Sequence, residues 1–257
     1  MKIKVTKVTK WNAPPVNDVR VLGMPNIPDA LHGPGCQPRT IVDPKEWERM
    51  RKQCYADAGY RCEACGYEHQ FPADLHAHEL FDIDYEQGTS TFVRLVCLCR
   101  RCHLYFIHSG RALTMYKQGD SLYSKERILE GVEHGFKLIS EYNKTHKRKI
   151  KVFATMGTSY LGEPELKKEM ESLIEKYGIN FYGANGKKMA AWGDWRMIWD
   201  GEEYPTPYKD ASEHNAKMAE LNKERVRERE LRDHHITGGI FDEIDKFLEG
   251  EENETRN

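Results

Sequence analysis

The sequence predicts an α+β fold: a metal-binding module of two strands and a helix, flanked by an N-terminal arm, further helices and a small aromatic unit. The first observation is a pair of Cys-x-x-Cys motifs, Cys62 with Cys65 and Cys99 with Cys102. Two runs of strand-like composition lie between the motifs, and amphipathic helical patterns precede and follow them. The predicted parts of the 257-residue chain are the arm 1–42, the module 43–118, a helical region 119–178 and a C-terminal unit 179–257.

Composition describes a polar-surfaced chain, with 39% hydrophobic residues, 31% charged residues and a formal net charge of −2. The first residues contain no apolar core of signal-peptide length, and no segment approaches the roughly 18 apolar residues of a membrane span. We therefore expect a cytoplasmic protein without a membrane partner. Because the net charge is close to zero, any surface for nucleic acid must come from local clusters of cations.

The chain before the cysteines is expected to form a strand, an arm and one helix. Residues 1–10 alternate lysine with β-branched residues, and the stretch after them is rich in proline and glycine without periodicity. A helix start is predicted at Asp43 as N-cap, with Pro44 in the first turn and Glu46 three residues after the cap. Apolar residues recur at helical spacing until Gly59, which is expected to end this helix.

After the module, two amphipathic helices are expected, over 124–143 and from Pro164 to Gly178. The stretch 179–208 is dense in aromatic residues and broken by glycines, which predicts a small β-hairpin unit. Residues 210–233 have the pattern of a charged helix, either a solvated face or a surface for a protein partner, and the last residues are expected to be disordered. The sequence leaves the oligomeric state open.

The cysteines carry the most specific signal of the sequence. Seven cysteines is an odd number, and two Cys-x-x-Cys pairs in a reducing compartment indicate metal binding rather than disulfides. Four thiolates from two short motifs, brought together by a hairpin, suit the tetrahedral coordination of a structural Zn²⁺. The competing interpretation is four buried free cysteines. Cys97 competes with Cys99 for one place, but only Cys99 belongs to a pair; Cys36 and Cys54 are interpreted as structural.

Histidines accompany the cysteine pairs: the strand "DLHAHEL" lies between them, and "LCRRCHLYFIH" runs from the second pair into a helix. This order, over about residues 60–118, resembles the HNH, or ββα-metal (His-Me finger), endonucleases and is most similar to the phage-type members. The resemblance implies metal-dependent hydrolysis of phosphodiester bonds, with double-stranded DNA as the expected partner and, for a phage-encoded protein, the host cytoplasm as its location. It also implies a catalytic Mg²⁺ or Mn²⁺ in addition to the structural Zn²⁺.

The resemblance assigns catalytic roles to the histidines. His103, directly after the second cysteine pair, matches the family's metal ligand on the helix. On the first strand His78 is the favoured essential residue, as general base with His76 in support, because strand alternation places both on one face. In the other register His78 is a metal ligand and Glu79 is the base, which needs a bend or bulge in the strand. Both registers stay open at this point.

Two positions depart from the family pattern. The family's asparagine, five residues before the first cysteine of "LCxxCH", is Arg94 here, and this arginine could contact phosphate instead. His108 lies five residues after His103, where many relatives have four, and five residues of a regular α-helix leave two side chains about 140° apart. Both histidines can bind one ion only if the helix ends or bulges near Phe106. His108 is therefore a metal ligand or a phosphate contact.

Cations and aromatic residues supply the candidate contacts to nucleic acid. The cations are Arg94, Arg111 and, in the run "KTHKRKIK", Lys147, Arg148 and Lys149. This run is interpreted equally well as a solvated end of a helix, where the helix dipole favours cations. The aromatic residues of the C-terminal unit, with Trp192, Trp195 and Trp199 among them, are candidates for base stacking or form the core of a small domain.

A second functional hypothesis comes from a different class. The chain could be a zinc-stabilised nucleic-acid-binding or adaptor protein whose HNH site has degenerated. The missing asparagine and the five-residue spacing between His103 and His108 support this hypothesis. Metal-dependent cleavage of nucleic acid separates it from the nuclease.

Overall fold

The computed structural model describes residues 17–24, 27–68, 74–120, 122–153, 164–182 and 189–221, together with residues 223, 224 and 227. Contacts along the chain define two compact units, residues 1–207 and residues 208–257. The strand expected over 1–10 and the disordered tail expected at the C-terminus lie outside the described residues.

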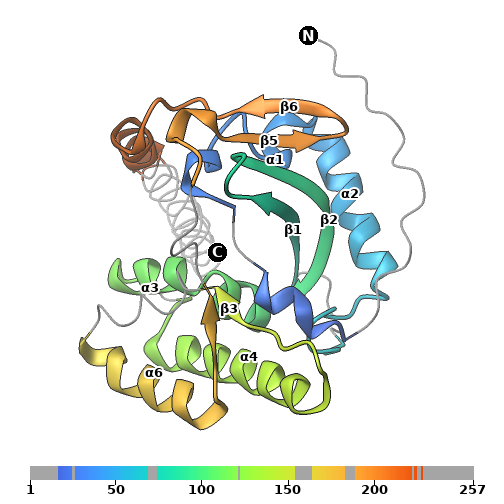
Figure 1. The fold of residues 1–257 in the computed structure, drawn as a ribbon, viewed down its shortest axis with the longest axis vertical. Helices are drawn as coiled ribbons and strands as arrows, with labels where there is room; N and C mark the ends of the chain where they lie inside the picture. The colour runs from blue at the N-terminus through green and yellow to red at the C-terminus, as the bar shows by residue number, and fades with distance from the viewer. Residues whose placement is uncertain are drawn as a thin grey trace, which may run out of the picture. The chain divides into compact units, whose positions relative to one another are not determined.

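A small four-stranded sheet organises the first unit (Figure 1). Strands β1 (Leu75–Asp84) and β2 (Thr89–Cys99) form an antiparallel hairpin. A second hairpin, β5 (Arg196–Trp199) with β6 (Glu202–Pro205), continues the sheet beside β2, so that the strand order is β1-β2-β5-β6 with β2 and β5 parallel. The sheet and the helices around it confirm the predicted α+β class.

The β1–β2 hairpin is regular where it carries the histidines. Pairing proceeds without a shift from Leu75 to Leu80, and the register then shifts between Leu80 and Phe81, which marks a β-bulge. Along the regular part, successive side chains of β1 point to opposite faces. His76 and His78 consequently share one face of the hairpin.

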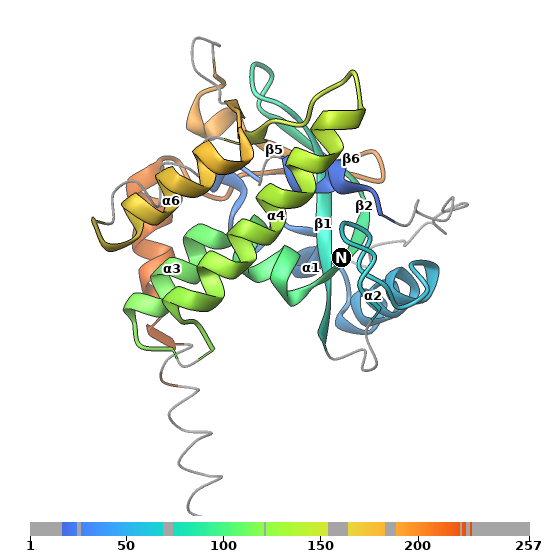
Figure 2. The same cartoon turned by 90° about the horizontal axis from the view of Figure 1, so that it is seen from below.

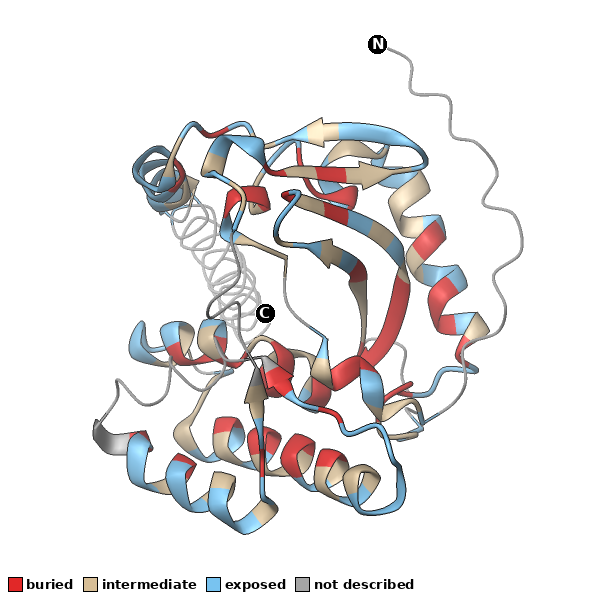
Figure 3. Cartoon of the chain, viewed as in Figure 1, coloured by how far each residue is buried: buried red, intermediate tan, exposed pale blue. Residues whose placement is uncertain are grey.

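Helix α2 (Pro44–Asp57) covers one face of the hairpin, and its bounds confirm the helix predicted from the sequence. The Asp43 carboxylate accepts a 2.8 Å hydrogen bond from the Lys45 N–H and so caps the first turn. Gly59, just beyond the helix, has the left-handed conformation with φ of 59°. Figure 3 shows the buried stripe of α2, and the buried residues of this layer are Met50, Cys54, Tyr55, Ala58, Leu75, Leu95 and Cys97.

The opposite face of the hairpin packs on helices that follow β2. The chain continues into the π-helical segment η4 (Arg101–Ile107), then α3 (Ser109–Lys117) and α4 (Lys125–Thr145). Figure 2 shows β1 and β2 between α2 on one side and α3 with α4 on the other. The sequence predicts one helix over η4 and α3; the structure divides it at His108, where the backbone (φ −97°, ψ 32°) leaves the helical region.

Two glycines of α4 let this helix approach η4 closely. A Cβ atom at Gly131 would collide with Tyr105, and one at Gly135 would collide with the ring of Phe106. Phe106 is fully buried, with its ring centroid 5.8 Å from that of Phe136 in α4. The contact holds η4 against α4 along its buried side.

Shorter elements surround these layers. Helix α6 (Pro164–Tyr177) confirms another predicted helix and packs on α4, where ion pairs join Lys125 to Glu169 at 2.9 Å and Lys176 to Glu133 at 2.7 Å. The remaining segments are η1 (Val19–Gly23), η2 (Asp29–Leu31), α1 (Pro38–Ile41), β3 (Val152–Phe153), β4 (Phe181–Tyr182) and η5 (Trp192–Asp194). Strands β3 and β4 pair in parallel as a separate two-stranded sheet.

The hairpin predicted within 179–208 is β5 with β6, and its aromatic residues contribute to the core. Trp195 is buried, with its ring centroid 6.0 Å from that of Tyr85. Trp199 lies 5.4 Å from Phe92 of β2, measured between ring centroids. These inward contacts assign Trp195 and Trp199 to packing rather than to base stacking.

In the second unit, residues 211–221 are helical, inside the charged helix predicted from the sequence. The Asp210 carboxylate accepts a 2.9 Å hydrogen bond from the Glu213 N–H and so caps its first turn. Across the part of the chain that the structure describes, no helix has both the length and the apolar character that a membrane crossing requires.

Candidate metal centres

Among the described residues, two groups of side chains bring their donor atoms close enough to share a metal ion. The first group consists of Cys62, Cys65, Cys99 and Cys102, whose sulfur atoms all lie within 4.8 Å of one another. The Cys65 and Cys99 sulfurs are 3.9 Å apart. Zinc–sulfur bonds of about 2.3 Å in a tetrahedron place the sulfurs roughly 3.8 Å apart. The four thiols therefore fit a structural metal such as zinc.

The four thiols are close enough to share hydrogen bonds, which divide them into two kinds. Hydrogen bonds with Cys102 and Cys62 hold the pKa of Cys65 well below its usual range and lower the pKa of Cys99 to about 6, whereas interactions within the group raise the pKa of Cys62 and of Cys102. The thiolate is the form that binds zinc. All seven cysteines are free thiols, so no disulfide competes for the four.

The other three cysteines lie in the core, away from the four-thiol group. Cys97, the sequence competitor of Cys99, packs with Cys54 in the layer under α2, on the face of β2 opposite to Val96 and Leu98. Burial raises the pKa of Cys97 to about 12. Cys36 is also buried, and its thiol donates a 3.1 Å hydrogen bond to the Leu31 carbonyl. These contacts agree with a structural role for all three.

Glu63 lies between Cys62 and Cys65 and connects the loop that carries these two cysteines to β2. Its backbone N–H donates to the Cys97 carbonyl, and its carboxylate accepts from the Cys97 N–H, both at 2.8 Å. The second carboxylate oxygen lies 2.8 Å from Nη1 of Arg94. Arg94, which the sequence offers as a phosphate contact, is thus the counter-charge of a buried glutamate, with its own side chain only 19% exposed.

The second group consists of His78 from β1, His103 from η4 and His108 at the end of η4. Their donor nitrogens also lie within 4.8 Å of one another, and the ring centroids are 4.7 to 5.2 Å apart. His76 lies beside this group, with its ring centroid 4.9 Å from that of His103. The structure therefore brings together all four histidines that the sequence selects.

A π-helical turn makes the five-residue spacing of His103 and His108 compatible with one ion. The His108 N–H donates to the His103 carbonyl at 2.9 Å, the i to i+5 hydrogen bond that defines such a turn. Because five residues complete the turn, the two side chains lie on the same side of the segment. The sequence requires a break or bulge near Phe106 for joint binding, and the structure contains one.

The histidine group has the protonation state that a metal ion needs. Burial lowers the pKa of His78 to about 4, and the positive charge of Arg39 adds to the effect. Burial and the neighbouring imidazoles hold the pKa of His103 and of His108 well below the usual range. The three rings are therefore neutral near pH 7 and can donate lone pairs. The Nδ1 atoms of His78 and His103 are buried without a hydrogen-bond partner in the described part of the chain, which also fits an ion at this position.

Two arginines from distant parts of the chain act on the histidine group. The charge of Arg39, in α1, disfavours protonation of His78 and His108, and the charge of Arg111, in α3, does the same for His103 and His108. The sequence selects Arg111 but misses Arg39, because no local pattern connects the N-terminal arm with β1. The surroundings of the group are therefore electropositive.

Glu79, the alternative base, is not a member of the histidine group. As the next residue after His78 in a regular strand, it points to the other face of β1. Its carboxylate lies 3.9 Å from Nε of Arg39, and burial raises its pKa. The bulge that could have turned it toward His78 comes later, after Leu80.

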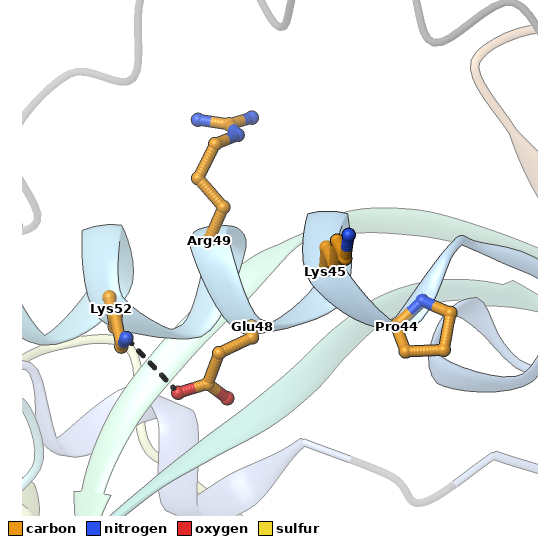
Figure 4. A pocket seen from close by; sticks show the side chains of 5 residues that line it. All are labelled: Pro44, Lys45, Glu48, Arg49 and Lys52. Atoms are coloured by element: carbon orange, nitrogen blue, oxygen red, sulfur yellow. Dashed lines mark ion pairs between the residues drawn. The ribbon is translucent and has the colours of Figure 1, made fainter.

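The remaining sequence candidates lie on other elements. Lys147, Arg148 and Lys149 are exposed in the loop that follows α4. A shallow surface hollow lies on α2 (Figure 4), on the helix that covers the opposite face of the hairpin from the histidines, and it is lined by Pro44, Lys45, Glu48, Arg49 and Lys52. The hollow contains no member of either metal-binding group.

Comparisons with protein families, curated proteins and solved structures find no match to this chain. The four thiols fit a structural role, because all four coordination positions come from the protein. The three histidines would leave some coordination positions of a bound ion open to other ligands.

Proposed function

We propose that the protein is a metal-dependent endonuclease of the HNH type that hydrolyses phosphodiester bonds in DNA. The observation that carries the proposal is the convergence of His78, His103 and His108, with His76 beside them, on a hairpin and helix joined by the four cysteines. The sequence resemblance to HNH endonucleases is independent support, because it selects the same histidines from their order along the chain.

The donor set bears on the choice of ion. A divalent ion held by the three imidazoles would neutralise negative charge on the scissile phosphate and on the departing oxygen. Imidazole nitrogen suits transition ions, whereas Mg²⁺ prefers oxygen ligands, and the group contains no carboxylate. Of the two catalytic ions that the resemblance implies, we therefore favour Mn²⁺ over Mg²⁺.

The proposed roles of the histidines follow from their positions. His78, His103 and His108 would hold the ion, because their donor nitrogens lie within 4.8 Å of one another. His76 is outside that set but on the same face of β1, and it accepts the proton of the attacking water. The sequence favours His78 as base with His76 in support, and the proposal exchanges these two roles. Glu79 has no catalytic part, since it faces the other side of β1.

The charged surroundings support a phosphate substrate. Arg39 and Arg111 both act electrostatically on His108 and approach from different elements. Guanidinium groups bind phosphate oxygens with paired N–H donors and keep their charge at any physiological pH. Together with a divalent ion they would offset the repulsion that protects a phosphodiester from attack.

Cleavage of supercoiled plasmid tests the proposal. Zinc-loaded protein with Mn²⁺ should give nicked or linear DNA, and Mg²⁺ should support a lower rate. His78→Ala and His108→Ala should lose both cleavage and Mn²⁺ binding, measured by calorimetry. His76→Ala should keep Mn²⁺ binding but cleave about 10²- to 10⁴-fold more slowly, as expected for loss of a general base. Glu79→Gln is the matched control on the same strand and should cleave like the wild type.

One observation favours the second hypothesis, a zinc-stabilised DNA-binding or adaptor protein without catalysis. Arg94 occupies the position of the family's asparagine and is engaged with Glu63 rather than with the histidine group. Under this hypothesis the wild type and His78→Ala bind DNA equally, and neither cleaves it with any divalent ion. The plasmid experiment therefore decides between the two functions.

A further inference from the structure

We propose that residues 144–151, which comprise the last two residues of α4 and the loop after it, form a docking site for the phosphate backbone of double-stranded DNA. We call this segment the basic loop. The identity of the polyanion rests on the proposed nuclease function. The presence of a docking surface rests on the charge and the geometry of the loop itself.

The basic loop concentrates positive charge in a chain whose net charge is −2. The cations within its eight residues are Lys144, Lys147, Arg148, Lys149 and Lys151. All of them are exposed to solvent. No acidic residue occurs between Glu141 and Glu163, so the sequence provides no local counter-charge.

The backbone of the basic loop is held at both ends. The Asn143 side chain donates a 2.9 Å hydrogen bond to the Ile150 carbonyl and accepts a 2.7 Å hydrogen bond from the Ile150 N–H. Ile150 is buried in the core, and the ring of His146 stacks on Tyr142 with centroids 3.7 Å apart. The cations thus project from an ordered backbone, which reduces the entropy lost when they bind a ligand.

Among the residues that the structure describes, interactions within the protein do not account for these cations. None of them forms an ion pair with another residue in the described ranges, although Lys149 donates to the Asn143 carbonyl. The helix dipole accounts for Lys144, in the last turn of α4, but its effect falls off beyond that turn. By contrast, Lys125 and Lys176 in the same layer are paired with glutamates. The surplus charge is therefore available to an external anion.

The side chains of the basic loop favour DNA over an anionic membrane. Binding to a lipid surface combines cations with apolar or aromatic side chains that enter the interface. In the basic loop the aliphatic residue Ile150 points into the core, and His146 is stacked on Tyr142. A phosphodiester backbone requires only spaced cations, and binding to it releases condensed counterions.

Equilibrium binding tests the basic loop without reference to cleavage. The His78→Ala substitution serves as the background, because it should prevent cleavage during the measurement. This variant is titrated into a fluorescein-labelled duplex of about 20 base pairs at several salt concentrations. Adding Lys147→Glu and Arg148→Glu should weaken binding by about tenfold or more and reduce the slope of log K against log salt by about two. Adding Lys45→Glu and Lys52→Glu on α2 (Figure 4) makes the same charge change on the other side of the hairpin, and affinity should stay within about twofold.

Equal loss of affinity in both variants, or no loss in the basic-loop variant, would overturn the docking site. The proposal also fails if the basic-loop variant keeps its affinity for DNA but loses binding to vesicles that contain phosphatidylserine. Loop-dependent binding by a wild type that never cleaves would leave this inference intact and refute the proposed nuclease function. Cleavage by the wild type together with binding that does not depend on the basic loop would support the proposed nuclease function and refute this inference.

Discussion

Glu63 places a carboxylate inside the metal loop, with only 1% of its side chain exposed. A buried charge is costly unless it is paired and hydrogen-bonded. Arg94 supplies the counter-charge at 2.8 Å, and the Cys97 N–H supplies a hydrogen bond of the same length. The pair therefore links the loop that carries Cys62 and Cys65 to β2, the strand that pairs with β1.

Removing Arg94 alone should destabilise the protein considerably. We expect Arg94→Ala to lower the free energy of unfolding by about 2 to 3 kcal/mol, somewhat less than for a fully buried pair, because Arg94 keeps some exposure. Urea denaturation of the zinc-loaded protein measures the change. Replacing both partners, as Arg94→Met with Glu63→Gln, should recover part of the loss, since no buried charge is then left unpaired.

Arg61→Ala is the matched control for this prediction. It breaks an exposed ion pair with Glu68 in the same loop, at 2.9 Å, and should cost less than about 1 kcal/mol. Equal losses for Arg61→Ala and Arg94→Ala would contradict the importance assigned to the buried pair.

The histidines show which features of single residues could be predicted from the sequence. Strand alternation alone places His76 and His78 on one face and Glu79 on the other, and the regular pairing of β1 agrees. The contacts of Arg39 and Arg94 were beyond its reach, because both form with residues far away in the chain. Such contacts depend on the path of the whole backbone and leave no local pattern.

At the level of elements, η4 determines whether the histidine group exists. A regular α-helix through this segment would keep His103 and point His108 about 140° away from it. In the structure an i to i+5 hydrogen bond between the two residues replaces the i to i+4 bond of an α-helix, and this one replacement returns His108 to the side of the segment that carries His103. The sequence states the condition, a bulge near Phe106, but cannot show that packing against α4 fulfils it.

Changing the length of η4 by one residue tests this geometry. Deletion of Leu104 reduces the spacing of the two histidines from five positions to four, which one α-helical turn brings within about 40°, so Mn²⁺ affinity should stay within about tenfold. Insertion of alanine between Leu104 and Tyr105 gives six residues and about 120° on an α-helix, and affinity should fall at least about 100-fold. Calorimetry measures both, with circular dichroism to verify folding. A deletion that abolishes the site while the insertion preserves it would contradict the π-turn argument.

The approach of α4 to η4 gives a further prediction. Gly131→Ala raises helix propensity by about 1 kcal/mol, but its Cβ collides with Tyr105, and overpacking costs about 1 to 3 kcal/mol. We expect a net loss of about 1 kcal/mol in thermal unfolding, together with weaker Mn²⁺ binding, because η4 must shift. Lys137→Ala, at an exposed position of the same helix, is the control and should stay within about 0.5 kcal/mol. Unchanged Mn²⁺ affinity in Gly131→Ala would contradict the inference that the position of η4 determines metal binding by the histidines.

At the scale of the whole molecule, features with short-range causes were predictable. The cap at Asp43, the helical stripes and the cysteine pairs each result from residues close together in sequence. The junction of β5 with β2 was not predictable, because parallel pairing between distant strands leaves no sequence pattern of its own. The hairpin was predicted as a unit of its own, whereas in the structure it extends the central sheet.

Removal of the metal should expose the cysteines in two kinetic phases. With a strong chelator, the thiols of Cys62, Cys65, Cys99 and Cys102 should react quickly with an aromatic disulfide reagent. Cys36, Cys54 and Cys97 should react slowly, at the rate of global unfolding, because burial both shields them and raises their pKa. Mass spectrometry of partly labelled protein identifies the sites. Rapid labelling of the four thiols without chelator would argue against a bound structural metal.

The adjacency of Cys102 and His103 makes the two metal groups thermodynamically dependent on each other. The thiols fix the start of η4, from which His103 and His108 extend, and β2 positions His78 by pairing it with Val96. An ion bound by the thiols would order the start of η4, so that an ion bound by the histidines would no longer have to supply the free energy for this ordering. If both groups bind ions, loading should be cooperative: zinc on the thiols would raise the affinity of the histidine group for the proposed second ion, and a zinc-free chain would bind that ion more weakly.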